Sequence, residues 1–279
     1  MKLYFHAHLG VGDLLIYTGL IRKLSEVYEE VIVPTRKLNR PTIERLYAGN
    51  PRITVLNVLG DYENKEQAFI HSQQGYEVLD GVEKVIDLNE GGYVNPGIGA
   101  GVTAYLTAGY HMYNSWVNFY FERNLESENE VYDYVVGDSK EDYAFCQLDI
   151  NKLNPEGSES PPNEELLPDM RIVEPYLSDE IPLVDYLKVI KNAKEVHVMD
   201  SSFACLIDRC YPSKSNMFNH KYMRWVRQVA NPTMMLGNWS LYLGENPPPE
   251  MDLQDYNKTI RKYFGDYNEG TNKFGVDLW

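Results

Sequence analysis

The chain has 279 residues, 43% of them hydrophobic and 24% charged, and this composition excludes a disordered, collagen-like or small disulfide-rich protein. Its net charge of −15 argues against nonspecific binding to nucleic acid or to an anionic membrane. The sequence has no run of 18 apolar residues and no signal-peptide pattern, and its three cysteines lack metal-binding spacing. We therefore expect a cytoplasmic protein without a membrane span.

The start of the chain follows a strand–helix–strand pattern. Residues 3–5 are apolar and predict a buried strand, and residues 31–33 predict a second one. Between them, apolar residues recur at three- and four-residue steps from Leu14 to Val27, and Asp13 stands where the N-cap of this helix is expected. Such a unit predicts a parallel sheet with a right-handed crossover.

Alternating strands and helices continue along the chain. In the first half, the patterns predict helices at 41–48, 63–73 and 110–123, strands at 53–58 and 85–87, and a polar linker at 124–130. In the second half, they predict strands at 131–136, 144–148, 170–173 and 195–199, one or two more strands after residue 212, helices at 183–193, 201–210 and 252–264, and a long loop at 151–168. The two series predict an α/β protein with two facing Rossmann-like domains, residues 1–130 and 131–279.

The loop between the first strand and the first helix is the first candidate site, because ligands of parallel sheets bind beyond the carboxyl ends of strands. It holds four residues suited to contact a substrate: His6, His8, Gly10 and Gly12. The glycines let a ligand approach the backbone, and the two histidines suit hydrogen bonds better than metal binding, so no metal site is expected. Asp13 is a candidate general base for a hydroxyl group, and a plain helix cap is its alternative role.

A second candidate site follows the strand predicted at residues 195–199. Asp200, Ser201 and Ser202 precede a helix, and hydroxyl groups with free amides at a helix N-terminus suit a phosphate group. The surrounding residues 188–227 hold eight basic and three acidic side chains, which fits a phosphate-bearing ligand and, equally well, a solvated basic face. The other candidates for nucleotide binding are Asp138, Ser139, His197, His220, Lys221 and Arg224.

Two segments resemble a known enzyme family. Residues 12–15 (GDLL) and 20–24 (LIRKL) resemble the N-terminal signature of heptosyltransferase-type, GT9-like glycosyltransferases. Residues 193–202 (AKEVHVMDSS) are similar to the donor-domain motif of that family, with Ser202 in place of its glycine. The resemblance implies the GT-B fold, which has two facing Rossmann-like domains, and relatives in bacteria and large DNA viruses.

The resemblance also implies an activity. A sugar would move from a nucleotide-sugar donor to a hydroxyl of a glycan or glycoprotein acceptor, without a metal or another cofactor and with inversion. Asp13 would be the general base, and Ser201 and Ser202 would lie beside the donor diphosphate. Two alternatives stay open: another Rossmann-type transferase such as a methyltransferase, and a catalytically degenerate module of the same fold that binds a glycan or a nucleotide.

Overall fold

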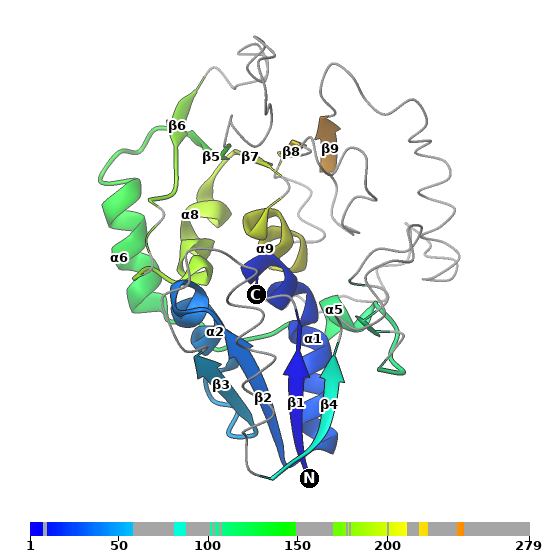
Figure 1. Ribbon diagram of the computed structural model, residues 1–279. Helices are drawn as coiled ribbons and strands as arrows, with labels where there is room; N and C mark the ends of the chain where they lie inside the picture. Colours follow the sequence, from blue (N-terminus) through cyan, green and yellow to red (C-terminus); the bar gives the residue numbers. More distant parts are fainter. Residues whose placement is uncertain are drawn as a thin grey trace, which may run out of the picture. The chain divides into compact units, whose positions relative to one another are not determined.

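The protein is described by a computed structural model (Figure 1). The structure describes residues 1–7, 10–57, 81–87, 101, 104–105, 108–148, 170–176, 178, 180–199, 201–210, 218–222 and 239–242. The chain forms two compact units. The first contains Met1–Leu125 and Leu177–Asp185, and the second contains Glu126–Tyr176 and Tyr186–Trp279.

The first unit contains a four-stranded sheet in which every strand is parallel to its neighbours. In the order β3-β2-β1-β4, its strands are Ile53–Asn57, Glu30–Thr35, Lys2–His6 and Val82–Asp87. Tyr4 of β1 pairs with Ile32 of β2 and with Val85 of β4. The predicted parallel α/β architecture is therefore confirmed in this unit, and the strand carboxyl ends lie along one edge.

Helix α1 (Val11–Val27) is the long helix of this unit, and its first residue corrects the predicted cap. Gly10 is the N-cap, with extended backbone angles φ −72° and ψ 137°, so the prediction that Asp13 caps the helix is wrong. Asp13 is instead the third helical residue, because Val11 and Gly12 extend the helix beyond the apolar repeat that begins at Leu14. A short 3₁₀ helix, η1 (Lys37–Asn39), and α2 (Arg40–Tyr47) follow β2, which confirms the helix predicted at 41–48.

The helix predicted at 110–123 is wrong, because only α5 (Asn114–Val117) is helical there. Three aromatic side chains of this stretch are nevertheless buried: Trp116, Phe119 and Phe121. Their spacing marks burial along an irregular segment, in which Phe119 and Phe121 meet edge to face with ring centroids 6.0 Å apart. Periodic aromatic residues therefore anchor this stretch to the core without forming a helix.

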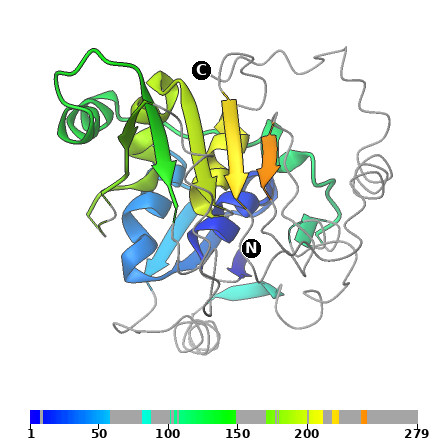
Figure 2. The same cartoon turned by 90° about the horizontal axis from the view of Figure 1, so that it is seen from above.

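The second unit contains a five-stranded sheet, also wholly parallel (Figure 2). In the order β6-β5-β7-β8-β9, its strands are Arg171–Val173, Tyr143–Gln147, Glu195–Met199, Phe218–Tyr222 and Trp239–Tyr242. The 3₁₀ helix η3 (Leu183–Tyr186), of which only Tyr186 belongs to this unit, leads into α8 (Leu187–Asn192), and α9 (Ser202–Cys210) follows β7. These elements confirm the helices predicted at 183–193 and 201–210 and the strands predicted at 144–148, 170–173 and 195–199.

Helix α6 (Leu125–Val135) corrects two predictions, the linker at 124–130 and the strand at 131–136. Glu126 and Glu128 lie in its first turn, where the helix dipole favours negative charge. Gly137, with φ +68°, supplies the left-handed residue that commonly follows the end of a helix. The β-branched and aromatic residues of 131–135 are therefore helical. Of the apolar residues from 131 to 136, only Val131 and Val136 are buried.

Three predicted elements lie outside the described residues: the helix at 63–73, the loop at 151–168 and the helix at 252–264. Among the helices that the structure describes, none has the length and apolar character needed to cross a membrane.

Candidate functional site

The loop after β1 lies at the carboxyl edge of the first sheet, as the sequence predicted. His6 is the last residue of β1 and is completely buried, and Gly10 is buried at the start of α1. Asp13 is half-buried in the first turn of the helix, where backbone N–H groups have no partner within the helix. His8 lies outside the described residues. The structure therefore brings His6, Gly10, Gly12 and Asp13 to one edge.

Two further polar residues end strands at this edge, and sequence reasoning missed both. Thr35 ends β2 and is completely buried, and Asn57 ends β3. The Oδ1 atom of Asn57 is buried and has no hydrogen-bond partner among the residues that the structure describes. The signal that could have identified them is a polar residue at the end of an apolar strand, because parallel neighbours bring such residues to the same edge.

A cavity of about 770 Å³ lies in the first unit, beside the helix that follows β2. It is lined by residues of α2 and Ala48 after it, by residues 122–125 at the start of α6, and by Pro182. Its charged lining is mixed: Glu44, Arg45, Glu122 and Arg123. Arg45 also lies 3.6 Å from the carboxylate of the buried Asp185, so this ion pair ties α2 to residues 177–185.

The second candidate site is built where two neighbouring strands of the second sheet end. Gln147 is the last residue of β5, Met199 is the last residue of β7, and α9 begins at Ser202. The Ser201 hydroxyl donates a hydrogen bond of 2.7 Å to Oε1 of Gln147, whose side chain is 8% exposed. Sequence reasoning missed Gln147, although its amide at the end of an apolar strand was a usable signal. Asp200 lies outside the described residues.

His197 is held inside the second sheet. It lies two residues before the end of β7, is 1% exposed, and its Nε2 is 3.0 Å from Oε2 of Glu195. In the strand register it pairs with Cys146 of β5. Burial raises the pKa of the Cys146 thiol to about 12, and the charges of Glu174 and Glu195 add to this effect. The nucleotide-binding role of His197 stays a prediction.

Asp138 and Ser139 do not follow a strand. They lie in the turn between α6 and β5, and the Ser139 hydroxyl accepts a hydrogen bond from the N–H of Glu141. They therefore precede β5 at its amino end, whereas Gln147 marks its carboxyl end. The strand predicted at 131–136, which these two residues would have followed, is wrong. The structure does not bring Asp138 and Ser139 together with Ser201. Their role in nucleotide binding stays a prediction.

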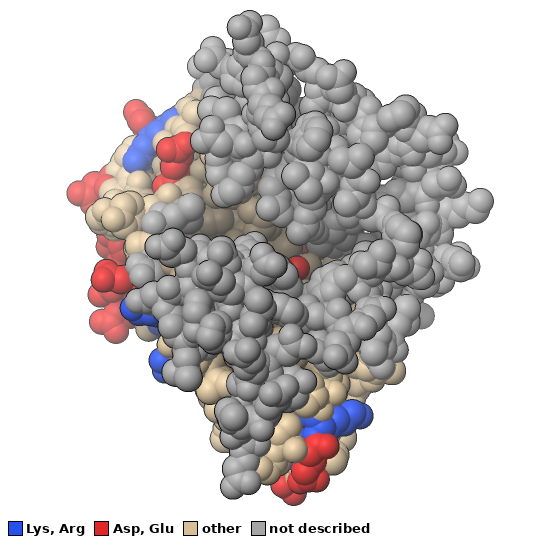
Figure 3. Space-filling view, in the orientation of Figure 1, with Lys and Arg blue, Asp and Glu red and all other residues tan. Residues whose placement is uncertain are grey.

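The basic stretch at residues 188–227 is only partly described. Arg209 is completely buried and donates to the carbonyl of Cys205, and Lys194 lies 3.7 Å from the Asp142 carboxylate. The Lys188 ammonium donates to Oδ1 of Asn129. On the face shown in Figure 3, basic and acidic side chains lie near one another over the described surface. Three cations of this stretch, Lys188, Lys194 and Arg209, thus have partners within the unit.

The remaining candidates are placed by backbone alone. His220 and Lys221 lie in β8, where they pair with His197 and Val198 of β7, and Arg224 lies outside the described residues. No group of three or more His, Cys, Asp or Glu side chains is arranged to hold a metal ion within the described ranges. Independence of a metal ion stays a prediction.

The fold of the chain is similar to a solved structure. No protein-family model matches the sequence, and no curated protein matches it. The structure is similar to that of the glycosyl transferase family 9 protein from Veillonella parvula DSM 2008, with a TM-score of 0.51 and 9% sequence identity. The match covers 100% of this chain and 93% of that chain. At this identity, the likeness is one of fold. It supports the predicted Rossmann-like α/β class.

Proposed function

We propose that the protein is a glycosyltransferase that moves a sugar from a nucleotide-diphosphate-sugar donor to a hydroxyl group of a glycan or glycoprotein acceptor. The observation that carries this proposal is the placement of polar groups directly after interior strands of two parallel sheets. Asp13 follows β1 in the first turn of α1, and Ser201 and Ser202 follow β7 at the start of α9. The fold shared with a glycosyl transferase family 9 protein supports the same function.

Asp13 is the general base in this proposal. Its carboxylate takes the proton of the acceptor hydroxyl while that oxygen attacks the anomeric carbon of the donor sugar. The bond between this carbon and the diphosphate oxygen breaks, and the nucleoside diphosphate leaves with the bonding electrons. A single displacement of this kind inverts the anomeric centre. His6, Gly10 and Gly12 lie at the same sheet edge and are the proposed contacts of the acceptor.

The start of α9 holds the donor diphosphate. Backbone N–H groups at a helix N-terminus and the helix dipole both favour negative charge, and this charge grows on the leaving group during transfer. Ser202 is half-buried as the first residue of α9. Because these groups stabilise the departing diphosphate directly, the proposed reaction needs no metal ion. The cytoplasm, where nucleotide sugars are made, is the proposed location.

Thermal unfolding with a panel of nucleoside diphosphates and nucleotide sugars, with and without Mg²⁺, tests the donor site. A ligand at 100 times its dissociation constant stabilises the folded protein by about 2.7 kcal/mol. Stabilisation by one nucleotide, equal with and without Mg²⁺, supports the proposal and names the donor class. A folded protein that no nucleotide stabilises contradicts it.

Asp13→Asn tests the catalytic role, with Glu26→Gln as the matched control. Glu26 lies on the same helix, and its side chain is 62% exposed. We expect Asp13→Asn to bind the donor as before and to lose about 100-fold or more of turnover, measured as nucleoside diphosphate release, because general base catalysis contributes at least that much. Glu26→Gln should match the wild type. Unchanged turnover in Asp13→Asn contradicts the assignment, and donor binding without any turnover in the wild type favours the degenerate binding module.

A further inference from the structure

A tyrosine hydroxyl forms hydrogen bonds with the backbone of α1 about one turn after Asp13. The Tyr105 hydroxyl donates a hydrogen bond of 2.8 Å to the carbonyl of Ile16 and accepts one of 3.0 Å from the N–H of Leu20. In an α-helix, the carbonyl of one residue pairs with the N–H four residues later, so these two groups are helical partners of each other. One side chain therefore bridges both ends of a helical hydrogen bond. We call this arrangement the Tyr105 bridge.

A second side chain reinforces the bridge. The Ser115 hydroxyl donates a hydrogen bond of 2.8 Å to the same Ile16 carbonyl. A carbonyl oxygen has two lone pairs, so it can accept a hydrogen bond from both hydroxyls. The Tyr105 and Ser115 side chains are completely buried, so water does not compete for these bonds. A side chain inserted between helical partners is a known cause of a bend in a helix.

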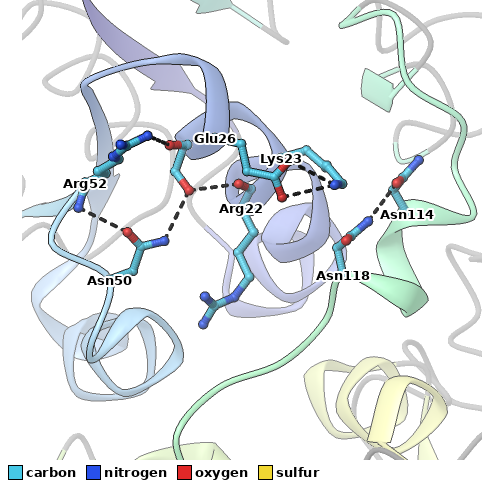
Figure 4. Close-up of polar contacts among 8 residues, drawn as sticks. Arg22, Lys23, Glu26, Asn50, Arg52, Asn114 and Asn118 are labelled. Atoms are coloured by element: carbon cyan, nitrogen blue, oxygen red, sulfur yellow. Dashed lines mark hydrogen bonds and ion pairs between the residues drawn. The ribbon is translucent and has the colours of Figure 1, made fainter. Parts of the chain in front are cut away.

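The other half of α1 is held by a separate set of contacts (Figure 4). The Ser25 hydroxyl donates to the carbonyl of Arg22 and accepts a hydrogen bond of 3.1 Å from the Asn50 amide, and the Arg52 guanidinium donates to the Ser25 carbonyl. The Ser25 contacts and the Tyr105 bridge are thus two of the polar attachments of this helix within the first unit. The Tyr105 bridge is the one next to Asp13, because residues three apart lie on the same side of a helix.

We propose that Tyr105 and Ser115 are positioning residues, which set the direction of the first turn of α1 and so place the Asp13 carboxylate for proton transfer. This inference rests on the proposed function, in which Asp13 is the general base. Misplacement of a catalytic group by about 1 Å can cost up to 100-fold in rate. Loss of the bridge should therefore lower turnover without weakening the donor site, which lies in the second unit.

Tyr105→Phe removes the bridging hydroxyl and keeps the ring. Tyr47→Phe is the matched control, because the buried Tyr47 hydroxyl also contacts α1, through a 3.4 Å hydrogen bond to the Thr18 side chain, but does not reach the helix backbone. With the donor found in the nucleotide panel, we expect kcat for nucleoside diphosphate release to fall about tenfold in Tyr105→Phe while the donor KM changes less than twofold. Tyr47→Phe should keep the wild-type kcat at a temperature well below its melting point.

A readout without turnover separates this inference from the proposed function. In backbone amide NMR spectra, Tyr105→Phe should shift the resonances of residues 11–16 and of Leu20 and leave those of residues 22–27 in place. Ser115→Ala removes the hydrogen bond from Ser115 to the Ile16 carbonyl and leaves the Tyr105 hydroxyl in place. It should show the same pattern with a smaller fall in kcat, which keeps the inference testable if Tyr105→Phe fails to fold. Wild-type kcat in both variants, in a protein whose Asp13→Asn variant is inactive, overturns the inference. An active Asp13→Asn variant overturns the proposed base instead.

Discussion

Gly19→Ala tests the close approach between α1 and the backbone near α5. A Cβ atom on Gly19 would overlap the carbonyl oxygen of Asn114 and would lie 2.8 Å from its carbonyl carbon and 3.1 Å from Cα of Ser115. These are backbone atoms, so a change of side-chain rotamer cannot relieve the overlap. Overpacking costs about 1–3 kcal/mol, and we take the upper end for a rigid backbone. The better helix propensity of alanine returns up to about 1 kcal/mol, so the free energy of unfolding should fall by about 2 kcal/mol.

Thermal unfolding followed by circular dichroism measures this loss. For a chain of this size, 1 kcal/mol corresponds to about 2–4 °C, so the melting temperature of Gly19→Ala should fall by about 4–8 °C. Val27→Ala is the control on the same helix, since Val27 is 65% exposed and its truncation should change stability by less than about 0.5 kcal/mol. A Gly19→Ala variant that melts at or above the wild-type temperature refutes the close approach, and with it the position of Ser115 beside the Ile16 carbonyl.

Two further perturbations address the buried polar groups. Arg22 is 4% exposed, donates to the Leu46 carbonyl near the end of α2 and stacks 3.7 Å from the ring centroid of Tyr120. Arg22→Ala should therefore lower the free energy of unfolding, measured in urea, by about 2–4 kcal/mol. An unchanged urea midpoint would show that these contacts contribute nothing to stability. Burial raises the pKa of Cys146 from 9.0 to about 12 and the pKa of Tyr186 from 10.0 to about 12. Because the folded state holds these two protons more tightly, the stability that they contribute is complete below about pH 9 and is lost as the pH rises to about 12. The urea midpoint of the wild type should therefore fall between pH 9 and pH 12. It should fall less in Tyr186→Phe, which lacks one of the two groups.

Much of the fold could be predicted from the sequence, because its strands are short apolar runs joined by amphipathic helices. Residues 31–33 are flanked by charged residues and a proline, and the structure places them in β2. Residues 195–199 (EVHVM) form the middle strand of the second sheet, and all of them except Glu195 are buried, as expected for a strand covered on both faces. In these segments, local pattern and tertiary burial favour the same element.

The prediction failed where local pattern and tertiary structure disagree. Residues 131–135 (VYDYV) have the composition of a strand, but Tyr134 is 66% exposed and the segment is the end of α6. A helix can carry aromatic side chains on a face that is exposed to solvent. The sequence pattern of one segment does not show which of its faces other elements cover. Likewise, the aromatic residues near Trp116 are buried at roughly helical spacing, although only four residues there form a helix.

Sequence patterns predicted the residues of the candidate site that a single segment identifies, and missed those that depend on contacts between distant segments. Sequence reasoning identified Asp13, Ser201 and Ser202 because each stands between a strand and a helix. It missed the roles of Gln147 and Tyr105, because these roles depend on partners far along the chain. Gln147 meets a residue 54 positions away, and Tyr105 bonds to Ile16 across 89 positions. Such pairs follow from the order of strands in a sheet and from helix packing, neither of which a single segment encodes.

The hydrogen bond between Ser201 and Gln147 predicts different roles for the two serines at the start of α9. A serine hydroxyl has one proton to donate, and that of Ser201 goes to Oε1 of Gln147. Turning it toward a phosphate would leave a buried amide oxygen without a partner, which costs about 1–3 kcal/mol. Ser202 has no such engagement among the described residues. A hydrogen bond to a charged group is worth about 1.5–3 kcal/mol, so Ser202→Ala should weaken nucleoside diphosphate binding about tenfold or more in calorimetric titration. Ser201→Ala should weaken it less and lower the melting temperature more, and the reverse order would show that Ser201 is the phosphate ligand.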